Sequence, residues 1–217
     1  MKQFFEIVDV TAREIMDLNF QNTLEVEITL DDETVGRAAA PSGMPNARDV
    51  SMAVQNVNIE ISEALLAMNA LDQPSIDRML LELDGSAGAS RLGANALLAV
   101  SLACAKAAAF SSGLPLYHYV GGVNAKMIPV SMESAENVLR LSEYPTLTRF
   151  LAAAASLQRT GKRLVVSAGE GETEDPVIAD LAVALNAEGL VTKSSAVYNE
   201  LMRIEEELFD VPEYPEN

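Results

Sequence analysis

The sequence predicts a two-part fold, in which a small antiparallel sheet with helices is followed by alternating strands and helices. Three observations carry this prediction. Apolar and polar residues alternate from Leu24 to Leu30, which is the period of a half-buried strand. Apolar residues then recur at helical spacing between Asp49 and Phe110. After Pro115 the order becomes strand, helix, strand, helix, which is typical of parallel βα units.

The first part begins with strands and continues with helices. Polar residues at Asp31–Glu33 predict a turn, Val35–Ala40 a returning strand, and Pro41–Gly43 a loop. The expected helices are one that Asp49 caps and that runs to Leu66, one from Ile76 that ends at Asp84, and one over Gly93–Ala109. The last is apolar nearly all round, so we expect it to be buried against several neighbours.

The second part contains three short apolar strands and three helices. The expected strands are Met127–Met132, Leu164–Ser167 and Leu190–Thr192, and the expected helices are Thr146–Thr160, Val177–Leu185 and Tyr198–Leu208. Val120–Gly122 lacks the spacing of a phosphate-binding loop and is interpreted as a linker between the two parts.

The charge of the chain excludes some classes of partner. With 15 Lys and Arg against 32 Asp and Glu, the formal net charge is −17. Nucleic acids and anionic membranes bind clustered cations, so neither is an expected partner. The N-terminal residues include no apolar stretch of signal-peptide length, and the apolar run Ala96–Ala105 is too short to span a bilayer, so a cytoplasmic protein is expected.

Few residues are candidates for a conventional site. Cys104 lies in an alanine-rich run, where a buried small hydrophobic residue is expected rather than a reactive thiol. His118 is the only histidine and lies in a turn-rich segment, where a solvated side chain is expected. One His and one Cys cannot make an ordinary zinc site. The acidic run Gly169–Asp175 either holds a cation or complements the dipole of the following helix, and we favour the second interpretation.

Several long segments, in the same order, resemble enolase, the dehydratase that interconverts 2-phosphoglycerate and phosphoenolpyruvate. AREIMD, TLEVEITL and GRAAAPSG resemble the opening strands and mobile loop of that family, and SRLGANALLAVSLACAKAAA and GLPLYHYVGG its N-terminal helices. VVSAGEGETEDPVIADLAVALNA and YNELMRIEEEL resemble its last barrel units and C-terminal helix. The resemblance covers most of the chain but only part of a usual family member.

The missing part is internal. MIPVSM resembles the first barrel strand, whereas LRLSEYPTLTRF resembles the segment of the sixth strand, so strands two to five would be absent. Strands six, seven, eight and one are neighbours in a closed eight-stranded barrel, so a contiguous half barrel would remain. The resemblance implies an α+β domain over residues 1–122 (antiparallel sheet plus helices), followed over 123–217 by a truncated α/β barrel remnant of about four strands with helices.

The resemblance also implies that the family's chemistry is lost. Enolase needs a basic Lys, an acid on the opposite face and Mg²⁺ to stabilise an enolate. The carboxylates that hold the principal ion, and the glutamates of the acid side, belong to strands in the missing part. Arg140 stands at the position of the catalytic Lys, and a guanidinium cannot act as a base at neutral pH. No cofactor is therefore expected, although the family uses magnesium.

Further substrate-binding positions of the family are altered. The motif SHRSGETED is represented by Ser167–Asp175, in which Ala168 replaces the His, and Gly169 and Glu170 replace the phosphate-binding Arg and Ser. Val191 replaces the substrate-binding Lys of the eighth strand. Lys193 could take that role only after a shift of two residues, about 7 Å along a strand.

One metal-binding position is retained. Ser42 matches the loop serine that coordinates a second Mg²⁺ in the family. A hydroxyl alone is a poor Mg²⁺ ligand, so retention of a turn for folding is the favoured interpretation.

The subunit contact of the family is matched better. In enolases an acid on the N-terminal strand pairs across the dimer with the Arg of RIEEEL, and the Arg of the ARE motif pairs with a Glu there. Glu25 and Arg203 match the first pair, and Arg13 and Glu206 the second. They could also be ordinary surface charges of small value. The adjoining family segment SRGNP is replaced by Leu18–Asn22, so this part of the contact must differ.

Two hypotheses of different class remain. The favoured one is an enolase-like protein without catalytic activity, which forms a homodimer or pairs with a full-length enolase. The alternative is an enzyme with residual or altered Mg²⁺-dependent lyase activity of the phosphopyruvate hydratase type, with the missing ligands supplied by another chain.

Overall fold

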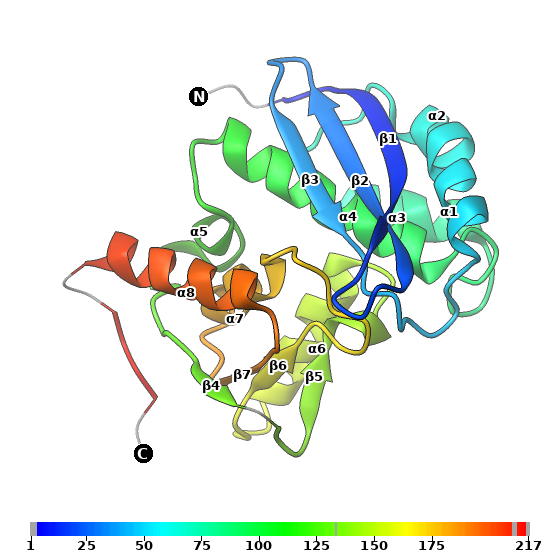
Figure 1. Ribbon diagram of the computed structural model, residues 1–217. Coiled ribbons are helices and arrows are strands. Elements are labelled where there is room, and N and C mark those ends of the chain that lie inside the picture. The colour runs from blue at the N-terminus through cyan, green and yellow to red at the C-terminus, as the bar shows by residue number, and fades with distance from the viewer. Residues whose placement is uncertain (1–3, 133, 210–211, 216–217) are drawn as a thin grey trace.

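The first part of the chain folds into the predicted antiparallel sheet. The computed structural model describes residues 4–132, 134–209 and 212–215. The strands, in the spatial order β1-β2-β3, are β1 (Ile7–Met16), β2 (Asn22–Leu30) and β3 (Val35–Ala39). Leu24, Val26 and Ile28 are fully buried on one face of the sheet, which packs on helices, while the other face is open to solvent (Figure 1).

Helices follow the sheet in the predicted order. They are α1 (Val50–Asn56), the π-helical turn η1 (Val57–Ile61), α2 (Ser62–Leu65), α3 (Gln73–Asp84), α4 (Ala94–Ser111), α5 (Leu116–Gly121) and the 3-10 turn η2 (Gly122–Asn124). The Asp49 carboxylate accepts hydrogen bonds from the backbone N–H groups of Ser51 and Met52, so it caps α1 as expected. The expected single helix up to Leu66 is interrupted by η1, a difference that apolar spacing alone does not reveal.

Helix α4 forms the centre of the core. It is long and apolar enough, by length and composition, to cross a membrane, but 83% of it is buried inside the protein. It packs behind β2 and β3 (Figure 1). Cys104 is fully buried on this helix, and burial raises the pKa of its thiol, as expected for a packing residue.

The second part contains a four-stranded, wholly parallel sheet. Its strands are β4 (Val130–Met132), β5 (Val138–Arg140), β6 (Val165–Ser167) and β7 (Gly189–Val191), and their spatial order is β4-β7-β6-β5. The remaining elements are the 3-10 turn η3 (Leu141–Glu143), α6 (Leu147–Gln158), α7 (Val177–Ala184) and α8 (Ser195–Leu208). This is the strand order one-eight-seven-six that a contiguous half barrel requires, so the predicted fold class is confirmed.

The two faces of this sheet differ in burial. Leu139, Val166 and Leu190 share one face and are buried; Ser131, on the same face, donates to the Tyr198 hydroxyl of α8 (2.7 Å), so this is the helix side. On the opposite face Val165 is buried, but Val130 at the β4 edge remains 48% exposed. The face that would line a closed barrel is therefore covered at its centre and open at one edge.

The described apolar side chains of the C-terminal tail leave the half barrel uncovered. From the sequence, Phe209, Val211 and Tyr214 are candidates to cover apolar surface left open by the missing strands. In the structure Phe209 is 78% and Tyr214 56% exposed, and Val211 lies outside the described residues. The tail instead adds backbone hydrogen bonds to the chain before β4, where the Ile128 N–H donates to the Glu213 carbonyl (2.8 Å). The tail thus pairs with backbone groups next to the β4 edge of the parallel sheet and does not cover a face of that sheet.

His118 lies in α5, within the segment that resembles the N-terminal helices of the family. Its ring lies 4.3 Å from that of Tyr117 and is partly buried, so it is less solvated than expected. The interpretation of Val120–Gly122 as a linker is refined, because these residues form the end of α5 and the start of η2.

A buried carboxylate joins the two parts at the start of α6. Asp77 of α3 accepts from the Ser101 hydroxyl of α4 (2.6 Å) and from the backbone N–H of Thr148 (2.9 Å). The Ser101 oxygen in turn accepts from the Leu147 N–H (2.9 Å). Two otherwise unpaired donors at the N-terminus of α6 are thus satisfied by residues of the first part.

A second buried carboxyl lies where four elements meet. Asp180 of α7 is almost wholly buried. Burial raises its pKa to about 7; Glu200 of α8 and Asp175 also raise it, while Lys106 of α4 and the Tyr117 backbone N–H of α5 lower it. The folded protein therefore holds a proton on Asp180 that the unfolded chain, with an ordinary value of 3.8, has already released at pH 6.

We predict that Asp180 makes stability fall as the pH rises. Because the pKa is higher in the folded state, its contribution is present in full below the unfolded value and is lost between about pH 4 and 7, a total on the order of 4 kcal/mol. Asp180→Asn should therefore be more stable than the wild type at pH 8, with a smaller difference at pH 5. Urea unfolding at both pH values measures this, with the exposed Asp9→Asn as a control. A difference that does not change with pH would contradict the assignment.

Candidate functional site

The carboxyl ends of the four parallel strands bring together the positions expected to be altered. Arg140 of β5 is in register with Ser167 of β6, which is in register with Val191 of β7, which is in register with Met132 of β4. Residues in register on parallel strands point to the same face of the sheet. The positions that resemble the family's catalytic Lys and substrate-binding Lys therefore lie in one layer, separated by a single strand.

Arg140 is not arranged as a base. Its guanidinium is half exposed and lies 3.4 Å from the Glu143 carboxylate, three residues further along the chain. Arginine stays protonated at every pH at which the protein is folded, so it can attract an anion but cannot remove a proton.

The loop after β6 leaves no room for a phosphate-binding side chain. Ala168 is buried, and Gly169 has a φ of +103°, a backbone conformation that L-residues rarely adopt. A Cβ at Gly169 would overlap the Ser142 hydroxyl, so the backbone could not hold an arginine here without moving. Glu170, the third altered position, is exposed and places a negative charge at this end of the sheet.

The metal-binding loop of the family is fastened to this same loop. The Ser42 N–H donates to the Gly171 carbonyl (3.0 Å), and the Gly43 N–H donates to the Glu170 carbonyl (3.1 Å). A Cβ at Gly171 would overlap Ser42, so the two loops touch along their backbones. The segment that resembles a mobile catalytic loop is thus part of a packed, hydrogen-bonded contact.

The Ser42 hydroxyl already has a partner. It donates to the Asp17 carboxylate (2.6 Å), which also accepts from the backbone N–H groups of Asn19 (2.7 Å) and Gln21 (2.8 Å). Burial alone would raise the pKa of Asp17, but these three hydrogen bonds outweigh it and hold the pKa below its ordinary value. The structure therefore pairs the candidate metal ligand with a charged acceptor.

Residues that follow β7, at the eighth-strand position, also bond to the loop after β6. Glu172 accepts from the Thr192 hydroxyl and from the Lys193 backbone N–H (2.9 Å), and its carbonyl accepts from the Leu18 N–H (2.9 Å). Lys193 itself is exposed, two residues beyond the layer in which Val191 lies. The structure thus keeps Val191, rather than Lys193, in the layer that contains Arg140.

A buried ion pair behind this contact was missed in the sequence. The Lys106 ammonium of α4 lies 2.6 Å from the Asp175 carboxylate, and both side chains are largely buried. Asp175 also accepts from the backbone N–H groups of Ala39 in β3 (2.8 Å) and Val177 in α7 (2.9 Å). The expected role of the acidic run at the start of a helix is thus fulfilled by Asp175, but the run also binds a cation, which comes from the chain itself. A single lysine inside the apolar run Gly93–Ala109 was the available signal.

The residues present do not fit a magnesium ion of the enolase type. Among residues 4–132, 134–209 and 212–215, no group of three or more His, Cys, Asp or Glu side chains is arranged to hold a metal. Mg²⁺ requires carboxylate or phosphate oxygens in near-octahedral geometry. Ser42 and Asp17 bind each other, and Glu172 binds Thr192 and Lys193, so the Ser42 hydroxyl and these two carboxylates are already engaged.

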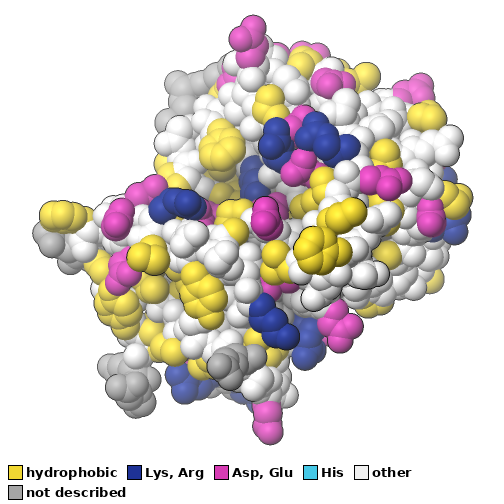
Figure 2. Space-filling model, in the orientation of Figure 1, with side chains coloured by type: hydrophobic (Ala, Val, Ile, Leu, Met, Phe, Trp, Pro, Cys, Tyr) yellow, Lys and Arg dark blue, Asp and Glu magenta, His cyan; other side chains and the backbone are white. Residues whose placement is uncertain are grey.

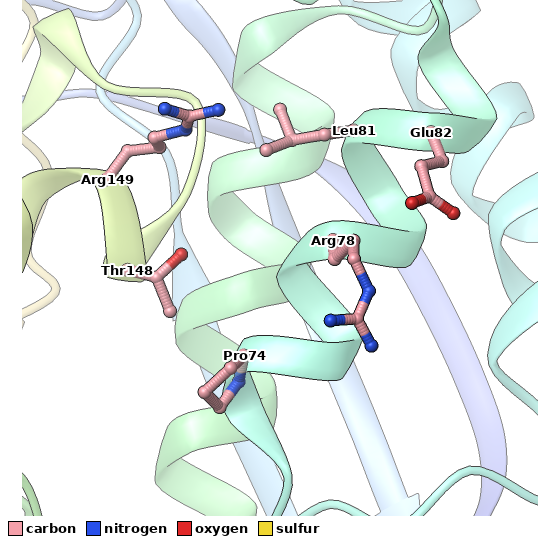
Figure 3. Close-up of a pocket in the computed structure, with 6 residues that line it drawn as sticks. All are labelled: Pro74, Arg78, Leu81, Glu82, Thr148 and Arg149. Carbon is pink, nitrogen blue, oxygen red and sulfur yellow. The ribbon is translucent and has the colours of Figure 1, made fainter.

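A cavity lies away from the strand ends, between α3 and α6. It has a volume of about 420 Å³ and is lined by Pro74, Arg78, Leu81, Glu82, Thr148 and Arg149. Figure 3 shows the guanidinium groups of Arg78 on α3 and Arg149 on α6 well apart from each other, so they do not converge on one point. Arg78 also donates to the Ser75 hydroxyl (3.0 Å). The arrangement lacks the convergent donors that phosphate groups need.

The four expected interface residues lie on three elements, β1, β2 and α8. Arg13 donates to Glu25 (2.8 Å) and to Glu27 (2.7 Å) on the open face of the first sheet, and Arg37 also contacts Glu27. Hydrogen bonds from Arg13 and Arg37 outweigh the effect of burial and lower the pKa of Glu27. Within the chain, Arg13 thus pairs with Glu25 rather than with Glu206.

The other two expected interface residues, Arg203 and Glu206, lie on α8. Arg203 contacts Glu200 (2.7 Å), and Glu206 is exposed. Figure 2 shows basic side chains over the first sheet and over α8, on either side of a hollow. A crevice of about 370 Å³ lies at the edge of the first sheet and is lined by Ile15, Met16, Glu25, Arg37, Ala39, Lys106, Thr173, Glu174, Asp175 and Pro176.

Comparison with known protein families agrees with this architecture. Residues 44–120 match the enolase N-terminal domain, and residues 123–217 match the enolase C-terminal TIM barrel domain. Together these matches cover most of the chain, and the four parallel strands correspond to part of such a barrel. Enolases generally use Mg²⁺, which makes the engaged oxygen ligands described above a departure from the family. The chain belongs to the enolase family, as a truncated member with part of the barrel.

Proposed function

We propose that this chain is a non-catalytic member of the enolase family that acts by self-association. The observation that carries the proposal is the engagement of the former metal-binding loop, in which Ser42 binds Asp17 and the Ser42–Gly43 backbone binds the loop after β6. Groups that would have to move and bind substrate in an enolase instead hold the two parts of this chain together.

The chemistry supports the absence of enolase turnover. Removing a proton next to a carboxylate requires a base near neutral pKa and positive charge to stabilise the resulting enolate. The layer at the strand ends offers Arg140, which cannot accept a proton, together with Ser167, Val191 and Met132. Glu170 and Glu172 add negative charge close to where a phosphorylated anion would have to enter.

The surface that carries the expected interface residues supports self-association. Two chains of net charge −17 repel each other, so a stable contact needs a face on which charges are compensated. On this face Arg13 and Arg37 are matched by Glu25 and Glu27. Exposed apolar side chains occur on the same elements or next to them: Met16 ends β1, Phe20 lies in the turn that follows, and Tyr198 and Met202 lie on α8. A full-length enolase that carries the same charge pattern is the second candidate partner.

We predict that the purified protein does not dehydrate 2-phosphoglycerate above background in the presence of Mg²⁺. Loss of one member of a catalytic unit already removes several orders of magnitude in rate, and the further losses are not additive. The formation of phosphoenolpyruvate, followed by absorbance, measures this. Turnover that disappears in Ser42→Ala or Lys193→Ala would demonstrate a working site and favour the alternative of residual lyase activity.

We predict a dimer that depends on Arg203 and Glu25. Removing one partner of a charge pair that is desolvated in an interface costs about 2–5 kcal/mol, so Arg203→Glu should raise the dimer dissociation constant on the order of 100-fold. Glu25→Arg in the same chain should restore part of the association. Sedimentation equilibrium measures both effects.

Arg163→Glu is the matched control for this experiment. Like Arg203, Arg163 is an exposed arginine that forms an ion pair with a glutamate of its own chain, Glu188 at 2.6 Å. It lies just before the amino end of β6, away from the four expected interface residues in the chain. It should leave the dissociation constant unchanged. A wild-type protein that sediments as a monomer would refute self-association outright.

A further inference from the structure

The turn between β1 and β2 holds a large apolar side chain in water. Phe20 is 81% exposed and has a φ of +59°, which is unfavourable for an aromatic residue. In the family segment SRGNP the third residue, which Phe20 replaces, is glycine, the residue that adopts this conformation without strain. Both the backbone conformation and the exposure of Phe20 therefore have a cost that its contacts within the chain do not offset.

The turn is rigid despite this cost. The Phe20 N–H donates to the Asp17 carbonyl (3.1 Å), the Asp17 N–H donates to the Gln21 carbonyl (2.9 Å), and the Asp17 carboxylate accepts from Asn19 and Gln21. Ser42 fixes the same carboxylate from the neighbouring loop. The phenyl ring is thus presented by a turn with five hydrogen bonds rather than by a loose loop, which reduces the entropy lost on binding.

The 370 Å³ crevice begins beside this turn. Met16, which lines it, directly precedes the turn, and the Leu18 N–H is bonded to Glu172, next to the lining residue Thr173. Its apolar wall comes from Ile15, Met16, Ala39 and Pro176. The rest of the lining is polar or charged and consists of Glu25, Arg37, Thr173, Glu174 and the paired Lys106 and Asp175. Since Phe20 of the same chain is exposed, its ring does not fill the crevice.

We propose that Phe20 of each protomer inserts into the crevice of a second copy of this chain across a two-fold axis. This inference rests on the proposed self-association and names its central anchor. A two-fold contact uses the same patch on both partners, and here one patch carries both the projecting ring and the recess. The compensated charges of Arg13 and Arg37 on the same face allow two acidic chains to approach. Arg37 can contact the face of the inserted ring, and such buried aromatic anchors dominate interface energies.

The first test is the removal of the ring. Phe20→Ser should raise the dimer dissociation constant about 30-fold, the effect of losing a central aromatic anchor. Phe110→Ser removes another exposed phenyl group, 58% exposed at the end of α4 and outside the crevice, and should have no effect. If Arg203→Glu separates the dimer while Phe20→Ser does not, self-association stands and this inference falls. If the wild type is monomeric, both fall.

The second test asks whether Phe20 of one protomer lies in the crevice of the other. Cys104 is fully buried and is the only native cysteine, so an introduced surface thiol can be addressed selectively. Phe20→Cys protein mixed with Glu174→Cys protein should form a covalent heterodimer with a short thiol-to-thiol cross-linker, because Glu174 lines the crevice. Replacing the second variant by Ile59→Cys, an exposed position on η1, should abolish the product. A dimer in solution that gives no cross-link between positions 20 and 174 would overturn the proposal.

Discussion

The contact between the two parts of the chain depends most on the buried ion pair between Lys106 and Asp175. It joins the central helix of the first part to the start of α7, and Asp175 also holds the edge strand β3 through the Ala39 N–H. A buried pair of this kind is costly to break on one side, by about 3–5 kcal/mol, because the remaining charge stays buried. Around it the backbone contacts of Ser42, Gly43 and Leu18 bind the loop after β6.

These contacts explain how half a barrel can be a stable structure. Parallel strands are normally covered on both faces and closed at their edges. Here α6, α7 and α8 cover one face, and the loops of the first part close the carboxyl ends of the strands (Figure 1). Asp77 and Ser101 extend the same junction to the start of α6. The former catalytic end of the sheet thus contributes to stability through groups that in an active enzyme would have to stay available to substrate.

The sequence predicted the fold well wherever the resemblance assigned strands to barrel positions. The order β4-β7-β6-β5 follows directly from reading the strands as one, eight, seven and six, and the location of Arg140 and Val191 in one layer follows from the same assignment. Helix α4 could be recognised because it is apolar on every side. The partial burial of His118 was missed because Gly and Pro flank its segment and made a turn at the surface the simpler interpretation.

The candidate site could be predicted only in part. Substitutions at Ala168 and Gly169 were visible in the sequence, but the lack of space at Gly169 depends on Ser142, which lies far away in the chain. The partner of Ser42 and the pairing of Lys106 with Asp175 likewise join residues from distant segments. No local spacing encodes such contacts. The exposed Phe20 was visible only as a departure from the family segment, and its significance comes from the turn that holds it and from the crevice beside it.

The central claim is that the half barrel is stabilised by contacts within its own chain and needs no partner to complete it. Hydrogen exchange of the Val165 and Val166 amides tests this most directly, because β6 lies inside the sheet, between β5 and β7. In the Arg203→Glu variant, at a concentration at which it is monomeric, both amides should exchange as slowly as in the wild type, with protection close to that of global unfolding. Rapid exchange in the monomeric variant, together with slow exchange in the dimer, would show that a second chain completes the barrel and would contradict the account.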